Sequence, residues 1–110
     1  MEIKQSSVNG HVVLNLGGQI DSTAAGLFEE SIVSLISSGT NNMIVDFSQV
    51  KFISSAGLRV LLLAAKKVKP YGGKVTLCNL SSDVKEVFDI SGFSVLFSIY
   101  STLDEAIKNS

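Results

Sequence analysis

The sequence predicts a single α/β domain over residues 1–110, with a mostly parallel central sheet of four to five strands, an N-terminal β-hairpin and about four helices. Three observations support this prediction. Strand-like and helix-like periodicities alternate along the chain, which is typical of right-handed crossovers between parallel strands. An Asn-Gly pair near the start predicts a tight hairpin. The apolar content of 45% in 110 residues is enough for one modest core.

The first two strands are predicted on either side of Asn9-Gly10. Residues 3–7 and 11–16 are short β-prone runs, and both positions of an Asn-Gly turn tolerate a positive φ. We expect Gly17 and Gly18 to end the second strand.

The apolar period becomes helical over residues 22–37, and Gly39 is a plausible stop. The residues expected to share the core-facing side of this helix, or to lie beside it, are Ala24, Leu27, Phe28, Ile32, Leu35 and Ile36.

A continuous apolar run over residues 43–47 predicts a central strand covered on both faces. A second helix is expected from Ser55 to about Lys69, ended by residues 70–73. Residues 74–78 then predict another buried strand, in which the only cysteine, Cys78, is expected to be an inert buried thiol.

The C-terminal part predicts a short helix, a strand and a final helix. The short helix covers residues 82–90, with Asp83 in its first turn, and stops near Gly92. Residues 97–100 are expected to form a short edge strand. Residues 101–105 carry two overlapping capping-box patterns, which predict the start of a terminal helix.

Composition narrows the possible partners and locations. A net charge of −1 gives no electrostatic footprint for nucleic acid or anionic lipid, and four lysines over residues 66–74 are best interpreted as a solvated helix end. One cysteine allows no intramolecular disulfide. Glu2 and Lys4 interrupt any signal-peptide pattern, and no apolar run approaches the roughly 20 residues needed to cross a bilayer. We therefore expect a cytoplasmic protein, and nothing demands more than a monomer.

The second helix has an unusual outer side. Positions spaced at 100° place Arg59 and the lysines opposite the predicted core-facing stripe, but Val60 and Leu63 lie among these cations. Either a neighbouring helix buries these two side chains, or they are scattered surface residues, or they form a partner-docking patch. The core-facing stripe itself is Leu58, Leu61, Leu62, Ala65 and Val68.

A pair of serines, Ser54 and Ser55, lies where the central strand gives way to this helix. A helix N-terminus has unpaired N–H groups and the positive end of the helix dipole, so it accommodates an anion. One of the two hydroxyls is expected to cap the helix. Gly57 indicates close backbone approach or a tight entry, and suggests that the space above the serines matters.

Catalysis is not indicated by these residues. The only histidine, His11, heads the second strand, and the residues around Ser55 lack the G-x-S-x-G pattern. Neither Gly17-Gly18 nor Gly72-Gly73 is followed by the Lys-Ser/Thr of a phosphate-binding loop, and no cluster of metal ligands is visible. We expect neither an enzyme nor a bound cofactor or metal.

Residues 45–62, VDFSQVKFISSAGLRVLL, resemble the signature of anti-sigma factor antagonists, which belong to the STAS domain family. The family pattern is an apolar strand, an Asp, and then Phe-(apolar)-Asp-Ser-Ser/Thr-Gly-Leu. Residues 18–21 and 72–93 also match family elements, so the resemblance covers nearly the whole chain. It implies a single STAS domain over residues 1–110.

The resemblance also implies a function and a site. The phosphorylated serine of the family corresponds to Ser55, and a nearby acidic residue to Asp21. Ser54 stands where the family has Asp, so Ser54 is the favoured cap of the second helix. Ala56 stands where the family has its second Ser/Thr. The implied partners are an anti-sigma factor that is also a serine kinase and a PP2C-type phosphatase, with no nucleic acid or membrane. The residues expected to bind the partner are Ser22, Thr23, Ala56, Arg59, Val60 and Leu63.

The implied mechanism is a partner switch. The unphosphorylated protein binds the anti-sigma factor, which releases a sigma factor, and phosphorylation of Ser55 ends the binding. STAS domains also occur as non-switching binding modules in transporters and multi-protein assemblies, so a constitutive interface is the alternative.

Overall fold

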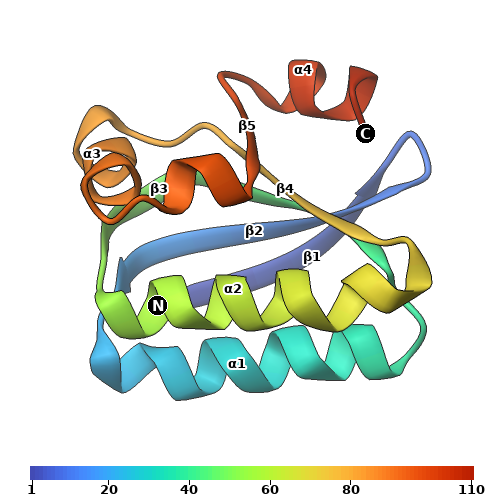
Figure 1. Cartoon of the computed structure of the whole chain (residues 1–110), viewed down its shortest axis with the longest axis horizontal. Coiled ribbons are helices and arrows are strands. Elements are labelled where there is room, and N and C mark those ends of the chain that lie inside the picture. Colours follow the sequence, from blue (N-terminus) through green and yellow to red (C-terminus); the bar gives the residue numbers. More distant parts are fainter.

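The computed structural model describes residues 1–110 and contains one five-stranded sheet (Figure 1). The strands lie in the order β1-β2-β3-β4-β5; β1 and β2 pair antiparallel, and the other neighbours pair parallel. This arrangement confirms the predicted mostly parallel sheet behind an N-terminal hairpin. The strands are β1 (Glu2–Val8), β2 (His11–Ile20), β3 (Asn42–Ile53), β4 (Lys74–Cys78) and β5 (Ser98–Tyr100).

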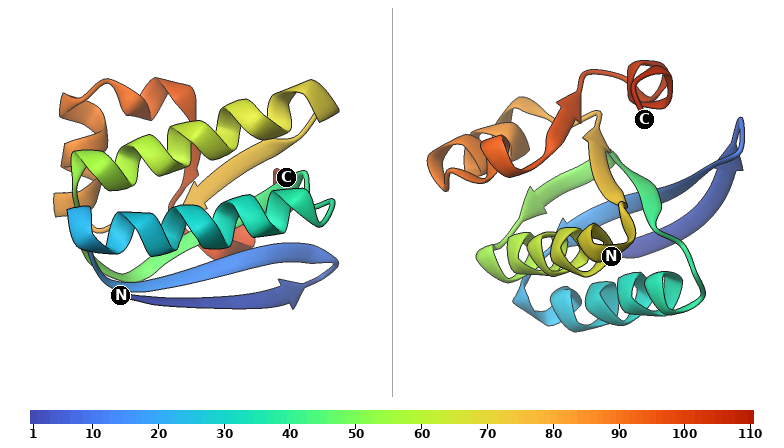
Figure 2. Two further views of the ribbon diagram at one scale, coloured as in Figure 1. Left: turned by 90° about the horizontal axis from the view of Figure 1, so that it is seen from below. Right: turned by 45° about the vertical axis from the view of Figure 1, so that its right-hand side comes forward.

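The four predicted helices are all present, and two short 3-10 helices, which the sequence did not indicate, follow α2 and α3. Helices α1 and α2 run side by side across one face of the sheet, and α4 covers the opposite face (Figures 1 and 2). Of the two capping-box patterns, the second supplies the cap of α4: the Thr102 hydroxyl accepts from the Glu105 N–H at 3.1 Å. The helices are α1 (Ser22–Ser37), α2 (Ser55–Val68), η1 (Lys69–Tyr71), α3 (Ser82–Ile90), η2 (Phe93–Leu96) and α4 (Leu103–Lys108).

The second and third strands are longer than predicted, and the expectation that Gly17 and Gly18 end β2 is wrong. The register between β2 and β3 shifts on both sides of this glycine pair, and Gly18 has a φ of +87°. Glycine therefore permits an irregular, bulged ladder instead of stopping the strand. As a result β2 and β3 both continue to one edge of the sheet, where Ile20 pairs with Ile53.

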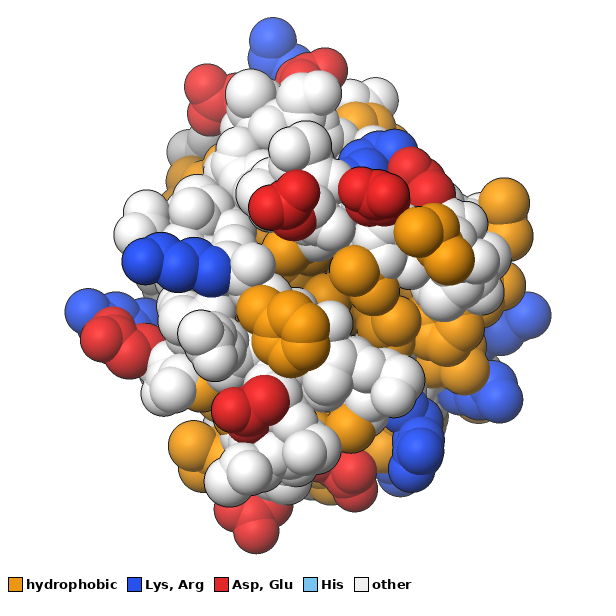
Figure 3. All heavy atoms as spheres, turned by 90° about the vertical axis from the view of Figure 1, so that its left-hand side faces the viewer, with side chains coloured by type: hydrophobic (Ala, Val, Ile, Leu, Met, Phe, Trp, Pro, Cys, Tyr) orange, Lys and Arg blue, Asp and Glu red, His pale blue; other side chains and the backbone are white.

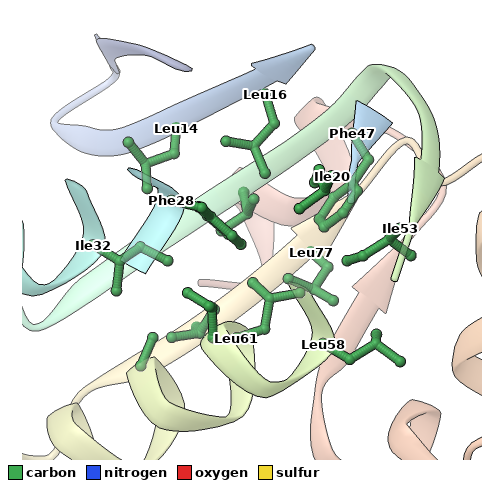
Figure 4. Packing of buried hydrophobic residues seen from close by; sticks show 14 of the residues in the cluster. Leu14, Leu16, Ile20, Phe28, Ile32, Phe47, Ile53, Leu58, Leu61 and Leu77 are labelled. Carbon is green, nitrogen blue, oxygen red and sulfur yellow. The ribbon is translucent and has the colours of Figure 1, made fainter. Parts of the chain in front are cut away.

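The larger core fills the space between the sheet and helices α1, α2 and α3. Figure 4 shows side chains from β2, β3 and β4 pointing toward those of α1 and α2. In α1 the buried residues are Ala25, Phe28 and Ile32, whereas Ala24 is half-buried and Leu27 is 55% exposed. The helix is thus rotated slightly from the predicted face.

The interpretation of Val60 as a surface residue of a docking patch is wrong. Val60 is 3% exposed and belongs to the core, because α1 packs along the side of α2 on which Val60 lies. Leu63, which was predicted to share that patch, is half-buried. Of the three interpretations, the structure therefore confirms burial by a neighbouring helix for Val60.

A smaller core lies under α4 and contains Cys78. The buried residues of this cluster are Val13, Ile44, Cys78 and Ala106. Burial raises the pKa of the Cys78 thiol from 9.0 to about 12, and the nearby Asp46 carboxylate acts in the same direction. Cys78 is therefore a neutral thiol over the physiological pH range, as the sequence predicted.

This raised pKa makes stability depend on pH above about 9. Below that pH the thiol is neutral in both states, whereas above it the unfolded thiol ionises and the folded one stays neutral. The free energy of unfolding should then fall by about 1.4 kcal/mol more for the wild type than for Cys78→Ala between about pH 8 and pH 10. Urea denaturation of both proteins measures this difference. Identical pH dependence, or rapid alkylation of the native thiol at pH 8, would contradict it.

Candidate functional site

The starts of α1 and α2 lie next to each other at the carboxyl edge of the sheet. Ile20 and Ile53 are paired residues at the ends of β2 and β3, and the Ser54 N–H donates to the Ile20 carbonyl at 2.8 Å. Asp21 and Ser54, the next residue of each strand, are thereby placed side by side. Figure 1 shows both helices beginning at this edge.

Each of the two helices has a side-chain cap, and the two caps are chemically different. The Asp21 Oδ1 accepts from the Ala24 N–H at 2.8 Å, and the Ser54 Oγ accepts from the Gly57 N–H at 3.2 Å. The structure therefore assigns the cap of α2 to Ser54, as the resemblance favoured. Ser55 is the first residue of α2 and is exposed. Of the two serines, Ser55 presents the more accessible hydroxyl.

Because only Ser54 caps α2, alanine substitutions at the two serines should differ in stability. Ser54→Ala removes the acceptor for the Gly57 N–H and should lower the free energy of unfolding by about 1 kcal/mol. Ser55→Ala should change it by less than about 0.5 kcal/mol, as expected for an exposed position. Urea denaturation of both variants checks this, and equal losses would contradict the assignment of the cap.

Gly57 is required by packing beneath the helix. A Cβ atom at this position would lie 2.8 Å from the Ile20 Cγ2 and 2.9 Å from the Ile53 Cγ1. The predicted close approach is confirmed. The contact, however, is with the strand ends below the helix rather than with the space above the serines. Gly57 thus sets how closely the first turn of α2 lies against β2 and β3.

A surface depression of about 540 Å³ adjoins the start of α1. Asp21 and Thr23, which were predicted as site residues, both line this depression, and so does Leu27, which was not. Ser22 and Arg59 are exposed, and Ala56 is half-buried. Apart from Val60 and Gly57, which are buried, the predicted site residues are therefore at least partly accessible. The lining residues are Met1, Gln19, Asp21, Thr23, Ala24 and Leu27.

Two exposed apolar side chains near the serines were missed from the sequence. Leu27 is 55% exposed on α1, and Phe52 is 47% exposed two residues before Ser54. A signal for Phe52 was present, because in a strand it must face away from the buried Ile53. Figure 3 shows the side of the molecule where α1 and α2 begin, and hydrophobic side chains gather across the middle of this face with acidic ones above and below them.

The only histidine of the chain lies far from the Ser55 hydroxyl. His11 lies at the start of β2, and that strand has ten residues, so the imidazole is about 30 Å from the edge where Ser55 lies. No group of three His, Cys, Asp or Glu side chains is placed to hold a metal ion. None of the helices combines the length and apolar content needed to cross a bilayer.

The chain is thus a small α/β domain with two adjacent capped helix starts and an exposed serine at the first position of α2. The chain belongs to the STAS domain family, whose model matches residues 2–106. BtrV of Bordetella bronchiseptica, which is named as an anti-sigma factor antagonist, is 33% identical over 106 residues, or 96% of this chain and 91% of BtrV. The anti-sigma-B factor antagonist of Bacillus subtilis is 31% identical over 99 residues, or 90% of this chain and 88% of that protein.

Solved structures agree with this assignment. The anti-sigma factor antagonist SpoIIAA in its unphosphorylated form matches with a TM-score of 0.83 and 25% identity, covering 98% of this chain and 95% of that one. Bacillus SpoIIAA in its phosphorylated form matches with a TM-score of 0.74 and 25% identity, covering 98% of both chains. The predicted similarity to anti-sigma factor antagonists is therefore confirmed.

Proposed function

We propose that this protein is an anti-sigma factor antagonist that binds an anti-sigma factor serine kinase and is switched off by phosphorylation of Ser55. The observation that supports this most directly is the division of roles between the two serines. Ser54 is engaged as the cap of α2, and Ser55 is exposed at the first helical position. The kinase can therefore reach Ser55 without disturbing the bond that starts the helix.

The helix start explains why the fold tolerates a phosphate there. Phosphorylation adds about −1.5 to −2 charges at neutral pH. Beside the unpaired N–H groups of a helix N-terminus such a charge is favourable by roughly 0.3–1 kcal/mol. The match of this fold to both forms of SpoIIAA supports the same conclusion. Phosphorylation then changes the binding surface of the protein and leaves the stability of the fold nearly unchanged.

The proposed docking surface combines polar and apolar groups around this edge. Leu27 and Phe52 supply exposed apolar area, which contributes most when a partner buries it. Asp21 caps the neighbouring helix, so a phosphate on Ser55 would place a second negative group beside this carboxylate. A partner that binds next to the Asp21 carboxylate alone would then meet two negative groups and the bulk of the phosphate, so binding would weaken. The other residues assigned to this surface are Ser22, Thr23, Ala56, Arg59 and the half-buried Leu63.

Mapping the phosphorylated residue tests the proposal. Incubation with the cognate anti-sigma factor kinase and ATP, followed by phosphopeptide mapping, should place the label on Ser55, and Ser55→Ala should abolish labelling. A PP2C-type phosphatase should remove the label and restore binding. A label solely on Ser54, or none on either serine, would refute the proposed switch.

A further inference from the structure

The cations of this chain are concentrated in one continuous segment. Residues 47–82 contain six of the nine Lys and Arg residues and none of the ten Asp and Glu residues. This segment therefore has a formal charge of +6, and the remainder of the chain has −7, although the whole protein is nearly neutral. The six cations are Lys51, Arg59, Lys66, Lys67, Lys69 and Lys74.

Three of these lysines surround a cleft of about 410 Å³ between the end of α2 and the start of β4. Leu62, Val75 and Leu96 give it apolar walls, and no carboxylate lines it. The ion pairs of the chain are Lys4–Glu2 and Lys85–Asp89, so none of the three cations is neutralised by a carboxylate within 4 Å. The lining residues are Leu62, Ala65, Lys66, Lys69, Gly73, Lys74, Val75, Leu96 and Ser98.

The cleft exists because the edge of the sheet is incomplete. The short β5 pairs only with Thr76 to Cys78, so the first two residues of β4, Lys74 and Val75, have no strand beside them on that side. Helix η2 brings Leu96 to this gap, where its side chain stays 52% exposed. On the other wall, α2 presents residues 62, 65 and 66, and Lys69 at the start of η1 continues this helical stripe, which has apolar side chains first and lysines last.

We propose that this cleft binds an anionic amphiphile, a molecule with a carboxylate or phosphate head and an aliphatic tail. The lysines provide charge-assisted donors for the head, and Leu62 and Leu96 provide a surface for the tail. The volume lies within the roughly 300–1,000 Å³ of small-ligand sites. Favourable placement at a helix C-terminus accounts for Lys66 and Lys67, but it explains neither Lys74 on β4 nor the exposed Leu96.

This site is separate from the proposed switch. Ser55 begins α2, whereas Lys66 lies in its last turn and the other two cleft lysines follow its end. A helix of 14 residues is about 21 Å long. Figure 1 shows the two ends of α2 on opposite sides of the molecule. The inference therefore stands or falls independently of the phosphorylation of Ser55.

Titration of the ¹⁵N-labelled protein with monomeric decanoate tests the proposal. We expect saturable shifts of the amide signals that line the cleft, those of Gly73, Val75, Leu96 and Ser98. Decyltrimethylammonium, which has the same tail and a cationic head, and propionate, which has the same head and a short tail, should give no saturable shifts at these positions. Equal effects of the cationic amphiphile, or no saturation with decanoate, would overturn the proposal.

A matched pair of variants separates the cleft from the general positive charge. Lys69→Gln combined with Lys74→Gln should weaken decanoate binding about tenfold, the size expected for losing two partly exposed ion pairs. Lys51→Gln combined with Lys67→Gln removes the same charge from exposed positions outside the cleft and should leave binding unchanged. Equal weakening in both pairs would overturn the site, as would binding to anionic phosphatidylglycerol vesicles without any response to monomeric decanoate.

Discussion

Replacing Ser55 with aspartate should weaken binding to the anti-sigma factor kinase by more than a hundredfold while leaving the fold intact. The carboxylate lies at the exposed first position of α2, where the helix dipole favours it. In the proposed complex, however, the same charge would be buried against the partner near the Asp21 carboxylate. A loss of about 3 kcal/mol of binding energy is enough for this hundredfold effect.

Isothermal titration with the purified kinase measures this effect, and the structure offers a close control. Ser81 caps α3 by accepting from the Val84 N–H at 3.2 Å, and Ser82 is the exposed first residue of that helix. Ser82→Asp thus places the same charge at the same helical position outside the proposed docking surface, and it should retain wild-type affinity. If Ser55→Asp unfolds, the proposed mechanism is wrong; if it binds as tightly as the wild type, the chain is a non-switching STAS module.

The parts of the site that the sequence predicted are those set by local chemistry. The spacing of apolar residues changes from strand-like to helix-like between β3 and α2, which predicted that Ser54 and Ser55 lie at a helix start. The preference of serine for the N-cap position does not depend on distant contacts. Gly57 was predicted to allow close approach for a similarly local reason. The direction of that approach, toward Ile20 and Ile53, depends on the pairing of β2 with β3.

The parts that the sequence did not predict depend on which elements become neighbours. Val60 lies among cations on a helical wheel, and only the position of α1 makes it a core residue. In the sequence, Gly17 and Gly18 indicated the end of a strand. In the structure β2 is paired with a strand on each side, and it continues through the two glycines with an irregular register. The lysines at the end of α2 likewise read as a solvated helix terminus, and the cleft beside them depends on the shortness of β5.

Alanine substitutions at two glycines of comparable helical position should have effects of opposite sign on stability. Gly26 lies within α1, and a Cβ atom there would meet nothing within 4 Å. Gly26→Ala should therefore raise the free energy of unfolding by roughly 0.5–1 kcal/mol, because alanine is the better helix former and restricts the unfolded chain. Gly57→Ala has the same intrinsic benefit, so any loss of stability there must come from contacts in the folded state.

The surroundings of Gly57 determine whether Gly57→Ala raises or lowers the free energy of unfolding. Its Cβ would press on the side chains of Ile20 and Ile53 at less than 3 Å and on the Ile20 carbonyl oxygen at 3.3 Å. Both isoleucines are buried, so they cannot move aside without disturbing the core, and such overpacking costs about 1–3 kcal/mol. After the gain in helix propensity is subtracted, Gly57→Ala should still lower the free energy of unfolding by about 1–2 kcal/mol.

Urea denaturation of the two variants beside the wild type measures the sign of both changes in the free energy of unfolding. Stabilisation by both substitutions would show that α2 can lift from the strand ends. In that case the position of Ser55 relative to Asp21 would not be fixed by packing, and the proposed docking surface would lose its rigid support.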